Sequence, residues 1–446
     1  MLNKNLLNHI KNAERLAPQH ERLLDIYSGN LTEYVKLDLQ SELSANSFSV
    51  ASKRIAVINL IQKITNKLSK VYSDKPKRTT ASDRDAEILT AYENEAEIQT
   101  VMTNAETLLN LNKAFALEPY IENGTIHVRV LAASEFCVYS DDINNPNKPT
   151  AFIKFMGSQA KGEKHTVNIY WIYTKDSFMV ADSDGEILSQ ELNPLGTLPF
   201  IYVNADSFSL TPKPDNDSFN NSILIPKLLT DLNYAVQYQS HSIMYGIDVD
   251  ASNLKGNPDS FWSIQSSEGE NKKPQLGVLS PSVDVDKVLS LITFTVSEWL
   301  SCKGIKPGAV GSLTAETAAS GLSKIVDEAE ASSVVDKNRL LLVKAEKALW
   351  QLIAIMHNTF VAVDLLNIKQ GLSDNLDVSI KFPEQMPIKD PAEKRNELKF
   401  KLENKLTSYL RALKEANPDM SEDEILKLKL EIEQENQAKA AQAPAV

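Results

Sequence analysis

Apolar residues recur at helical spacing in the first quarter of the chain. The pattern predicts a helix over residues 6–26 that ends at Ser28-Gly29-Asn30, with a polar stretch from there to Ser49. A second amphipathic helix is predicted over residues 55–71, and a third over residues 82–111 with Ser82 or Asp83 as its cap. This part of the chain is therefore expected to be helical.

The period of the pattern changes to two between residues 114 and 204. Alternating segments such as Ile126-His127-Val128-Arg129-Val130 are separated by turn residues such as Glu122-Asn123-Gly124, which predicts antiparallel strands joined by short loops. After a polar linker over residues 207–218, a helix is expected over residues 223–245 and another over residues 285–300. Between these two helices the pattern predicts three short strands, at residues 247–250, 261–264 and 275–279.

A loop rich in glycine and proline, residues 304–313, leads into an unusually long helical stretch that reaches about Val363. At 1.5 Å per residue, a helix of about 40 residues is roughly 60 Å long, which exceeds the width of a compact domain. A strand at residues 378–382 and charged helices from Pro391 to the end complete an α+β chain. A helix of this length favours a part of a large assembly over an ordinary enzyme core.

Composition limits the classes of function. The 446 residues carry a formal net charge of −12, whereas proteins that hold nucleic acid tightly are normally basic, at least locally. Cys137 and Cys302 have no metal-ligand spacing and favour a reducing compartment. The sequence contains no signal-peptide core and no apolar run that would span a membrane. Contact with nucleic acid is thus expected to be weak or absent.

Motifs of catalysis and of cofactor or metal binding are missing from the sequence. It has no phosphate-binding loop, no His-Glu-x-x-His, no Cys-x-x-Cys and no Gly-x-Ser-x-Gly, and its six histidines are scattered. A pair of catalytic carboxylates is not excluded by sequence, but nothing argues for one. We therefore expect no enzyme, no cofactor and no metal site.

The order of these parts resembles the portal proteins of tailed bacteriophages, and four local segments agree. Leu23-Leu24-Asp25-Ile26-Tyr27-Ser28-Gly29-Asn30 resembles the early helix of the family, and residues 54–76 resemble its next helix. Residues 193–203 resemble the Leu-Gly-x-x-Pro strand that closes the β-rich body, and Ala319-Ser320-Gly321-Leu322-Ser323-Lys324 resembles the start of the long helix. The resemblance covers roughly residues 6–401. A short, acidic C-terminal segment without a basic tail departs from many relatives.

The resemblance implies a ring, usually of twelve subunits, at one vertex of the capsid. Its parts would be a wing (residues 1–206, with the long helix and following strand at 319–390) and a linker with the first stem helix (207–246). A clip (247–283), a second stem helix (284–304), a tunnel loop (305–318) and a crown (391–446) would complete it. The ring would lie in the virion, and in the host cytoplasm during assembly.

Two groups of site residues follow from this resemblance. The DNA-facing tunnel loop would comprise Lys303, Lys306, Pro307, Gly308, Gly311 and Ser312. The clip would contact the packaging motor or the first tail adaptor through Phe261, Trp262, Lys272 and Lys273. The alternatives are that the lysines are ordinary solvated side chains, that the loop is a plain connector, and that Phe261 and Trp262 fill the core of the clip itself.

The expected partners are further copies of the chain, double-stranded DNA in the channel, the terminase large subunit, a head–tail adaptor, and the major capsid and scaffolding proteins. No membrane is expected among them. Two further hypotheses stay open. The chain could be a phage hydrolase with an unrecognised carboxylate site, or another virion structural protein such as a capsid or baseplate subunit.

Overall fold

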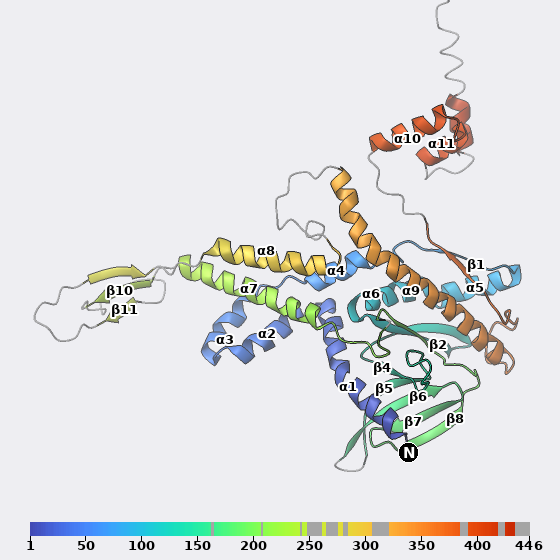
Figure 1. Cartoon of the computed structure of the whole chain (residues 1–446), viewed down its shortest axis with the longest axis horizontal. Helices are drawn as coiled ribbons and strands as arrows, with labels where there is room; N and C mark the ends of the chain where they lie inside the picture. The colour runs from blue at the N-terminus through green and yellow to red at the C-terminus, as the bar shows by residue number, and fades with distance from the viewer. Residues whose placement is uncertain are drawn as a thin grey trace, which may run out of the picture. The chain divides into compact units, whose positions relative to one another are not determined.

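The computed structural model describes residues 1–161, 165–206, 208–240, 243–247, 261–264, 275–279, 284–305, 321–383, 391–417 and 424–432 (Figure 1). Helices and strands are mixed in this part of the chain, as the hydrophobic pattern predicts. Two compact units divide it. The larger comprises Met1–Ala318 and Val326–Pro383, and the smaller comprises Ala319–Ile325 and Glu384–Val446.

The N-terminal helices begin as the sequence predicts but continue further. Helix α1 (Lys4–Asp25) is capped by Asn3, whose side chain accepts a hydrogen bond from the Asn5 amide, and Gly29 turns the chain with a φ of 116°. The following stretch, expected to be polar and without structure, is instead helical because Leu31, Val35 and Leu39 form one buried row at four-residue spacing. The remaining elements here are a π turn (Ile26–Asn30), α2 (Leu31–Glu42), α3 (Ala45–Ala51) and a 3-10 turn (Ser52–Arg54).

The next two predicted helices are shorter than expected. Helix α4 covers only Leu60–Leu68, since Asn59 caps it by accepting a hydrogen bond from the Gln62 amide and the β-branched residues before Asn59 stay outside the helix. The predicted helix over residues 82–111 is two helices, α5 (Asp83–Glu95) and α6 (Ile98–Asn112), because Glu97 adopts a left-handed backbone with a φ of 47°. The cap predicted at Ser82 is confirmed, since its hydroxyl accepts a hydrogen bond from the Asp85 amide.

Antiparallel strands form the β-rich body, as predicted. A three-stranded sheet has the order β3-β2-β9, and a five-stranded sheet has the order β4-β5-β6-β7-β8. Asn123 and Gly124, both with positive φ, close the β2–β3 hairpin at the predicted turn. The strands are β2 (Ala114–Glu122), β3 (Thr125–Ala132), β4 (Phe136–Tyr139), β5 (Ala151–Ala160), β6 (Thr166–Thr174), β7 (Ser177–Asp182), β8 (Ile187–Leu192) and β9 (Ile201–Asn204).

Helices α7 (Asn216–Ser240) and α8 (Val285–Cys302) lie side by side (Figure 1). They bury apolar side chains in one cluster with α2 and α4. The chain between them forms a separate three-stranded sheet of order β11-β10-β12, with bounds Ile243–Ile247 (β10), Phe261–Ile264 (β11) and Gln275–Leu279 (β12). The last two strands match the prediction, whereas the first lies four residues earlier than expected.

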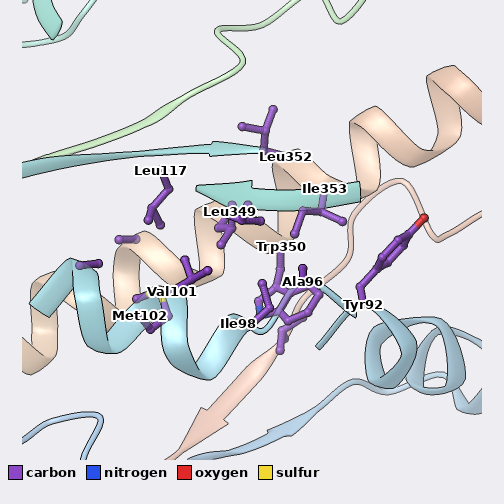
Figure 2. Close-up of a cluster of buried hydrophobic side chains, with 14 of the residues drawn as sticks. Tyr92, Ala96, Ile98, Val101, Met102, Leu117, Leu349, Trp350, Leu352 and Ile353 are labelled. Atoms are coloured by element: carbon purple, nitrogen blue, oxygen red, sulfur yellow. The ribbon is translucent and has the colours of Figure 1, made fainter. Parts of the chain in front are cut away.

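The long helix α9 (Gly321–Val361) contains 41 residues. In its second half Leu349, Trp350 and Ile353 lie in the main core together with Ile98 and Met102 of α6 (Figure 2). This confirms the prediction that the C-terminal half of the long helix is buried. After α9 the chain forms β13 (Ser379–Lys381), which pairs antiparallel with β1 (Lys77–Thr79).

The smaller unit contains α10 (Pro391–Glu403), α11 (Tyr409–Ala416) and a helical segment at residues 424–432. Ala412 and Ile425 are its buried apolar residues, while Leu406 and Leu430 are more than half exposed. The charged C-terminal helices predicted from Pro391 are thus present in the described residues.

Candidate functional site

The structure places only part of the predicted site. Lys306, Pro307, Gly308, Gly311 and Ser312 lie outside the described residues. Lys272 and Lys273 lie outside them as well, and Phe261 and Trp262 are on strand β11, where they are paired with Met244 and Tyr245 of β10. Of the predicted residues, Lys303 is the one whose surroundings are described. It lies at the end of α8, directly before the predicted tunnel loop.

The end of α8 is fixed by a Schellman motif. The Ile305 amide donates to the Leu300 carbonyl at 2.9 Å, and the Gly304 amide donates to the Ser301 carbonyl at 2.9 Å. Gly304 has a φ of 70°, which a residue with a side chain rarely adopts. Ile305 then inserts into the buried cluster of α7 and α8, where it is 1% exposed. The segment that follows therefore starts from an anchored position.

Lys303 is held by a buried carboxylate. Its ammonium lies 2.5 Å from Asp215, which also lies 3.7 Å from the Lys113 ammonium at the end of α6. Asp215 further accepts a hydrogen bond from the Ser218 amide in the first turn of α7. Burial alone would raise the pKa of Asp215, but the Lys303 ammonium outweighs it and holds that pKa below its usual range. One side chain thus joins the ends of α6, α7 and α8.

Several buried polar groups near this ion pair have no hydrogen-bond partner in the described residues. They are the side-chain amide of Asn112, the hydroxyl of Ser218 and the indole N–H of Trp299. Asn112 precedes Lys113, and Trp299 lies one helical turn before Lys303. Buried groups of this kind normally bind ordered water, so the junction around Asp215 has sites for water molecules.

Apolar side chains on α8 face outward. Leu291 and Phe294 are 51% and 64% exposed, on the face opposite Ile292, Val296 and Trp299, which are buried. On α7, Leu224 and Val236 are also exposed by about two fifths. An exposed phenylalanine beside an exposed leucine on one helix face is typical of a surface that another protein covers. We call Leu291 and Phe294 the apolar face of α8.

A separate open cavity of about 660 Å³ lies between α6 and the β2–β3 hairpin. Arg129 stacks over the Tyr120 ring at 4.9 Å and forms an ion pair with Glu118, so its charge is already compensated. His127 and the polar residues Thr100 and Asn104 also line the cavity. None of these side chains forms the nucleophile–base pair that hydrolysis requires.

Buried ionisable groups elsewhere hold elements together. Glu346 of α9 accepts hydrogen bonds from Tyr72, Arg78 and Trp350, and burial raises the pKa of Tyr72. His357 accepts a hydrogen bond from Tyr92 and donates one to the Gln370 carbonyl, while burial lowers its pKa. No group of three or more His, Cys, Asp or Glu side chains in the described ranges could hold a metal ion.

Sequence reasoning missed Asp215, which it placed in a linker. The signal that could have found it is Asp215-Asn216-Asp217-Ser218, since an Asp three residues before a Ser and just ahead of an apolar run is a helix-start pattern. Its partner Lys303 is 88 residues away, and no local pattern connects the two.

Comparisons with known proteins add no assignment. No family model matches the chain, and no curated protein has a matching sequence. Within the described helices, none is both long and apolar enough to cross a lipid bilayer.

Proposed function

We propose that this chain is the subunit of a portal ring, the channel through which a tailed bacteriophage packages and ejects its DNA. The proposal is supported chiefly by the order of α7, the β10–β12 sheet, α8, the 306–320 segment and the 41-residue helix α9. In a portal subunit these would be the stem, clip, second stem helix, tunnel loop and wing helix. The chain would act without catalysing a reaction, and would sit at one capsid vertex.

The apolar face of α8 gives this proposal a physical basis. A monomer that exposes Leu291 and Phe294 leaves apolar surface in water, at a cost of about 25 cal/mol for each Å². Packing against a neighbouring copy of the stem would remove that surface from water. A closed ring would do this for every copy, because head-to-tail contacts close when the rotation between subunits allows it.

The ion pair of Lys303 changes the expected chemistry of the tunnel loop. Since Asp215 compensates the Lys303 charge, this lysine supports the base of the loop, and the positive charge available to DNA would come from Lys306 or from other parts of the chain. The terminase large subunit, the adaptor and the capsid and scaffolding proteins remain proposed partners, with the clip strands as the docking surface for the first two.

Negative-stain electron microscopy of the purified protein tests the proposal. We expect rings of about twelve subunits with a central hole, formed directly or after concentration. Particles that stay monomeric under all assembly conditions would contradict it. An extended sheet or shell of subunits would instead indicate a capsid protein, and hydrolytic activity in the monomer would favour the enzyme hypothesis.

A further inference from the structure

Positive charge is concentrated in one short part of this acidic chain. Residues 43–82 contain eight Lys and Arg residues and a single acidic residue, Asp74, which gives a net charge of +7. Since the whole chain carries −12, the other 406 residues together carry −19. A segment whose charge is opposite in sign to the rest of a protein indicates a specific role for that charge.

Three of these lysines lie together on the outside of helix α4 and just after it. Lys63 and Lys67 are one helical turn apart within Leu60–Leu68, and Lys70 follows two residues after the helix ends. Lys63 and Lys70 are exposed and Lys67 is half-buried. None of the three forms an ion pair with any residue that the structure describes. We call Lys63, Lys67 and Lys70 the basic face of α4.

The opposite side of α4 determines where this basic face lies. Leu60, Ile61, Ile64 and Leu68 are buried in the cluster that also contains Trp299, Leu300 and Ile305. Figure 1 shows α4 at the C-terminal end of α8, where the chain continues into the 306–320 segment. The basic face is therefore fixed beside the base of that segment.

Neither an ordinary solvated surface nor a contact between copies of the chain fits these residues as well. A solvated helix face normally mixes both signs of charge, whereas residues 53–73 contain five Lys and Arg residues and no acidic one. A contact with a second copy of the chain would favour Arg and aromatic residues, because lysine is depleted in protein–protein interfaces. The exposed cations of α4 are lysines alone.

The spacing of the three lysines fits a nucleic-acid backbone. From Lys63 to Lys70 the chain advances by about 10 Å at helical rise, and one strand of duplex DNA places a phosphate about every 3.4 Å along its axis. The basic face thus spans about three phosphates. Lysine is a mobile point charge that contacts phosphate without fixed geometry, which suits DNA that must move past the protein.

We propose that the basic face of α4 contacts the phosphates of duplex DNA beside the base of the 306–320 segment. The choice of duplex DNA as the ligand rests on the proposed portal function. The charge asymmetry and the position of the lysines do not depend on that function.

Fluorescence anisotropy with a short labelled DNA duplex tests this, with binding measured between about 50 and 200 mM salt. The test variant is K63Q/K67Q/K70Q. The control is K4Q/K11Q/K175Q, which removes three exposed lysines from distant parts of the chain and so changes the net charge equally. Both are compared with the unmodified protein by thermal unfolding and by negative-stain microscopy.

We expect the slope of log K against log salt to become shallower by about 2.7 in the test variant, because each lost phosphate contact removes about 0.9. The slope of the control variant is expected to stay at the value of the unmodified protein. Equal slopes in the two variants would overturn the inference while leaving ring formation, and so the proposed function, untouched. Loss of rings in the test variant alone would overturn it too, since the face would then be an interface between copies. Absence of rings in the unmodified protein would contradict the portal function, yet the two slopes would still decide whether α4 binds DNA.

Discussion

Arg78 and Glu346 form an ion pair of 2.5 Å between side chains that are both completely buried, 268 residues apart in the sequence. Arg78 belongs to β1 and Glu346 to the long helix α9. Tyr72 and Trp350 donate further hydrogen bonds to the same carboxylate. This carboxylate therefore ties the segment that leads from α4 into β1 to the middle of the long helix.

Removing one partner of this pair should destabilise the larger unit strongly. Arg78→Met leaves the Glu346 carboxylate buried without its cation, and we expect the free energy of unfolding to fall by about 3–5 kcal/mol. Urea denaturation followed by circular dichroism measures this. The control is Lys75→Gln, which breaks the more exposed pair with Glu93 and should cost less than about 1 kcal/mol. Equal losses in the two variants would show that the buried pair has no special weight.

Acidification should destabilise the protein through His20. Burial lowers the pKa of His20 to about 4, so the folded state binds a proton there more weakly than the unfolded chain, whose histidine pKa is about 6.5. The contribution of His20 is complete above pH 6.5 and is lost as the pH falls towards 4. Between pH 7.5 and pH 5 we expect a loss of about 2 kcal/mol from this group.

Denaturation curves at several pH values test the role of His20. His20→Gln should reduce the pH dependence in this window, leaving the part that comes from His357, whose pKa burial also lowers. His165→Gln is the control because that ring is 60% exposed. An unchanged pH dependence in His20→Gln would contradict the assignment.

Periodic elements could be predicted from the sequence, and contacts between distant residues could not. The alternation of Val167 to Tyr173 and the apolar run of α9 carry their signal locally, so β6 and the long helix were predicted correctly. The break at Glu97 was missed because nothing local forces that residue into a left-handed backbone, and the packing of α5 and α6 decides it. Lys303 looked like a free cation for the same reason, since its partner Asp215 is remote in sequence.

The Asp215–Lys303 pair should govern the stability of the α7–α8 base. Asp215→Asn removes the negative charge between two lysines and weakens the cap of α7, and we expect a loss of about 1–3 kcal/mol. Hydrogen exchange should become faster at residues 216–220 and 300–305. In a double-mutant cycle, Asp215→Asn and Lys303→Met should lose less together than the sum of their separate losses. Strict additivity would show that the two side chains act independently.

The apolar face of α8 should be required for association. Phe294→Asp places a charge where a neighbouring copy would pack, and we expect loss of the ring with the subunit still folded. Mass photometry measures the change in particle mass. Leu192→Asp is the control because Leu192 is 87% exposed on the edge strand β8, away from α7 and α8 in the sequence. Rings of normal mass in Phe294→Asp would exclude this face as the contact between subunits.

The segment after Ile305 should serve DNA passage and not ring assembly. Because the Schellman motif and the burial of Ile305 fix the end of α8, deletion of Pro307–Ser312 shortens the chain beyond an anchored point. We expect rings to form as in the unmodified protein, while the DNA retained in assembled heads, measured by nuclease protection, decreases. Deleting Asn145–Lys148 from the exposed loop between β4 and β5 controls for the loss of loop residues. If the first deletion abolishes rings and the second does not, the segment is a structural connector, and the positive charge that meets DNA must be sought on α4 alone.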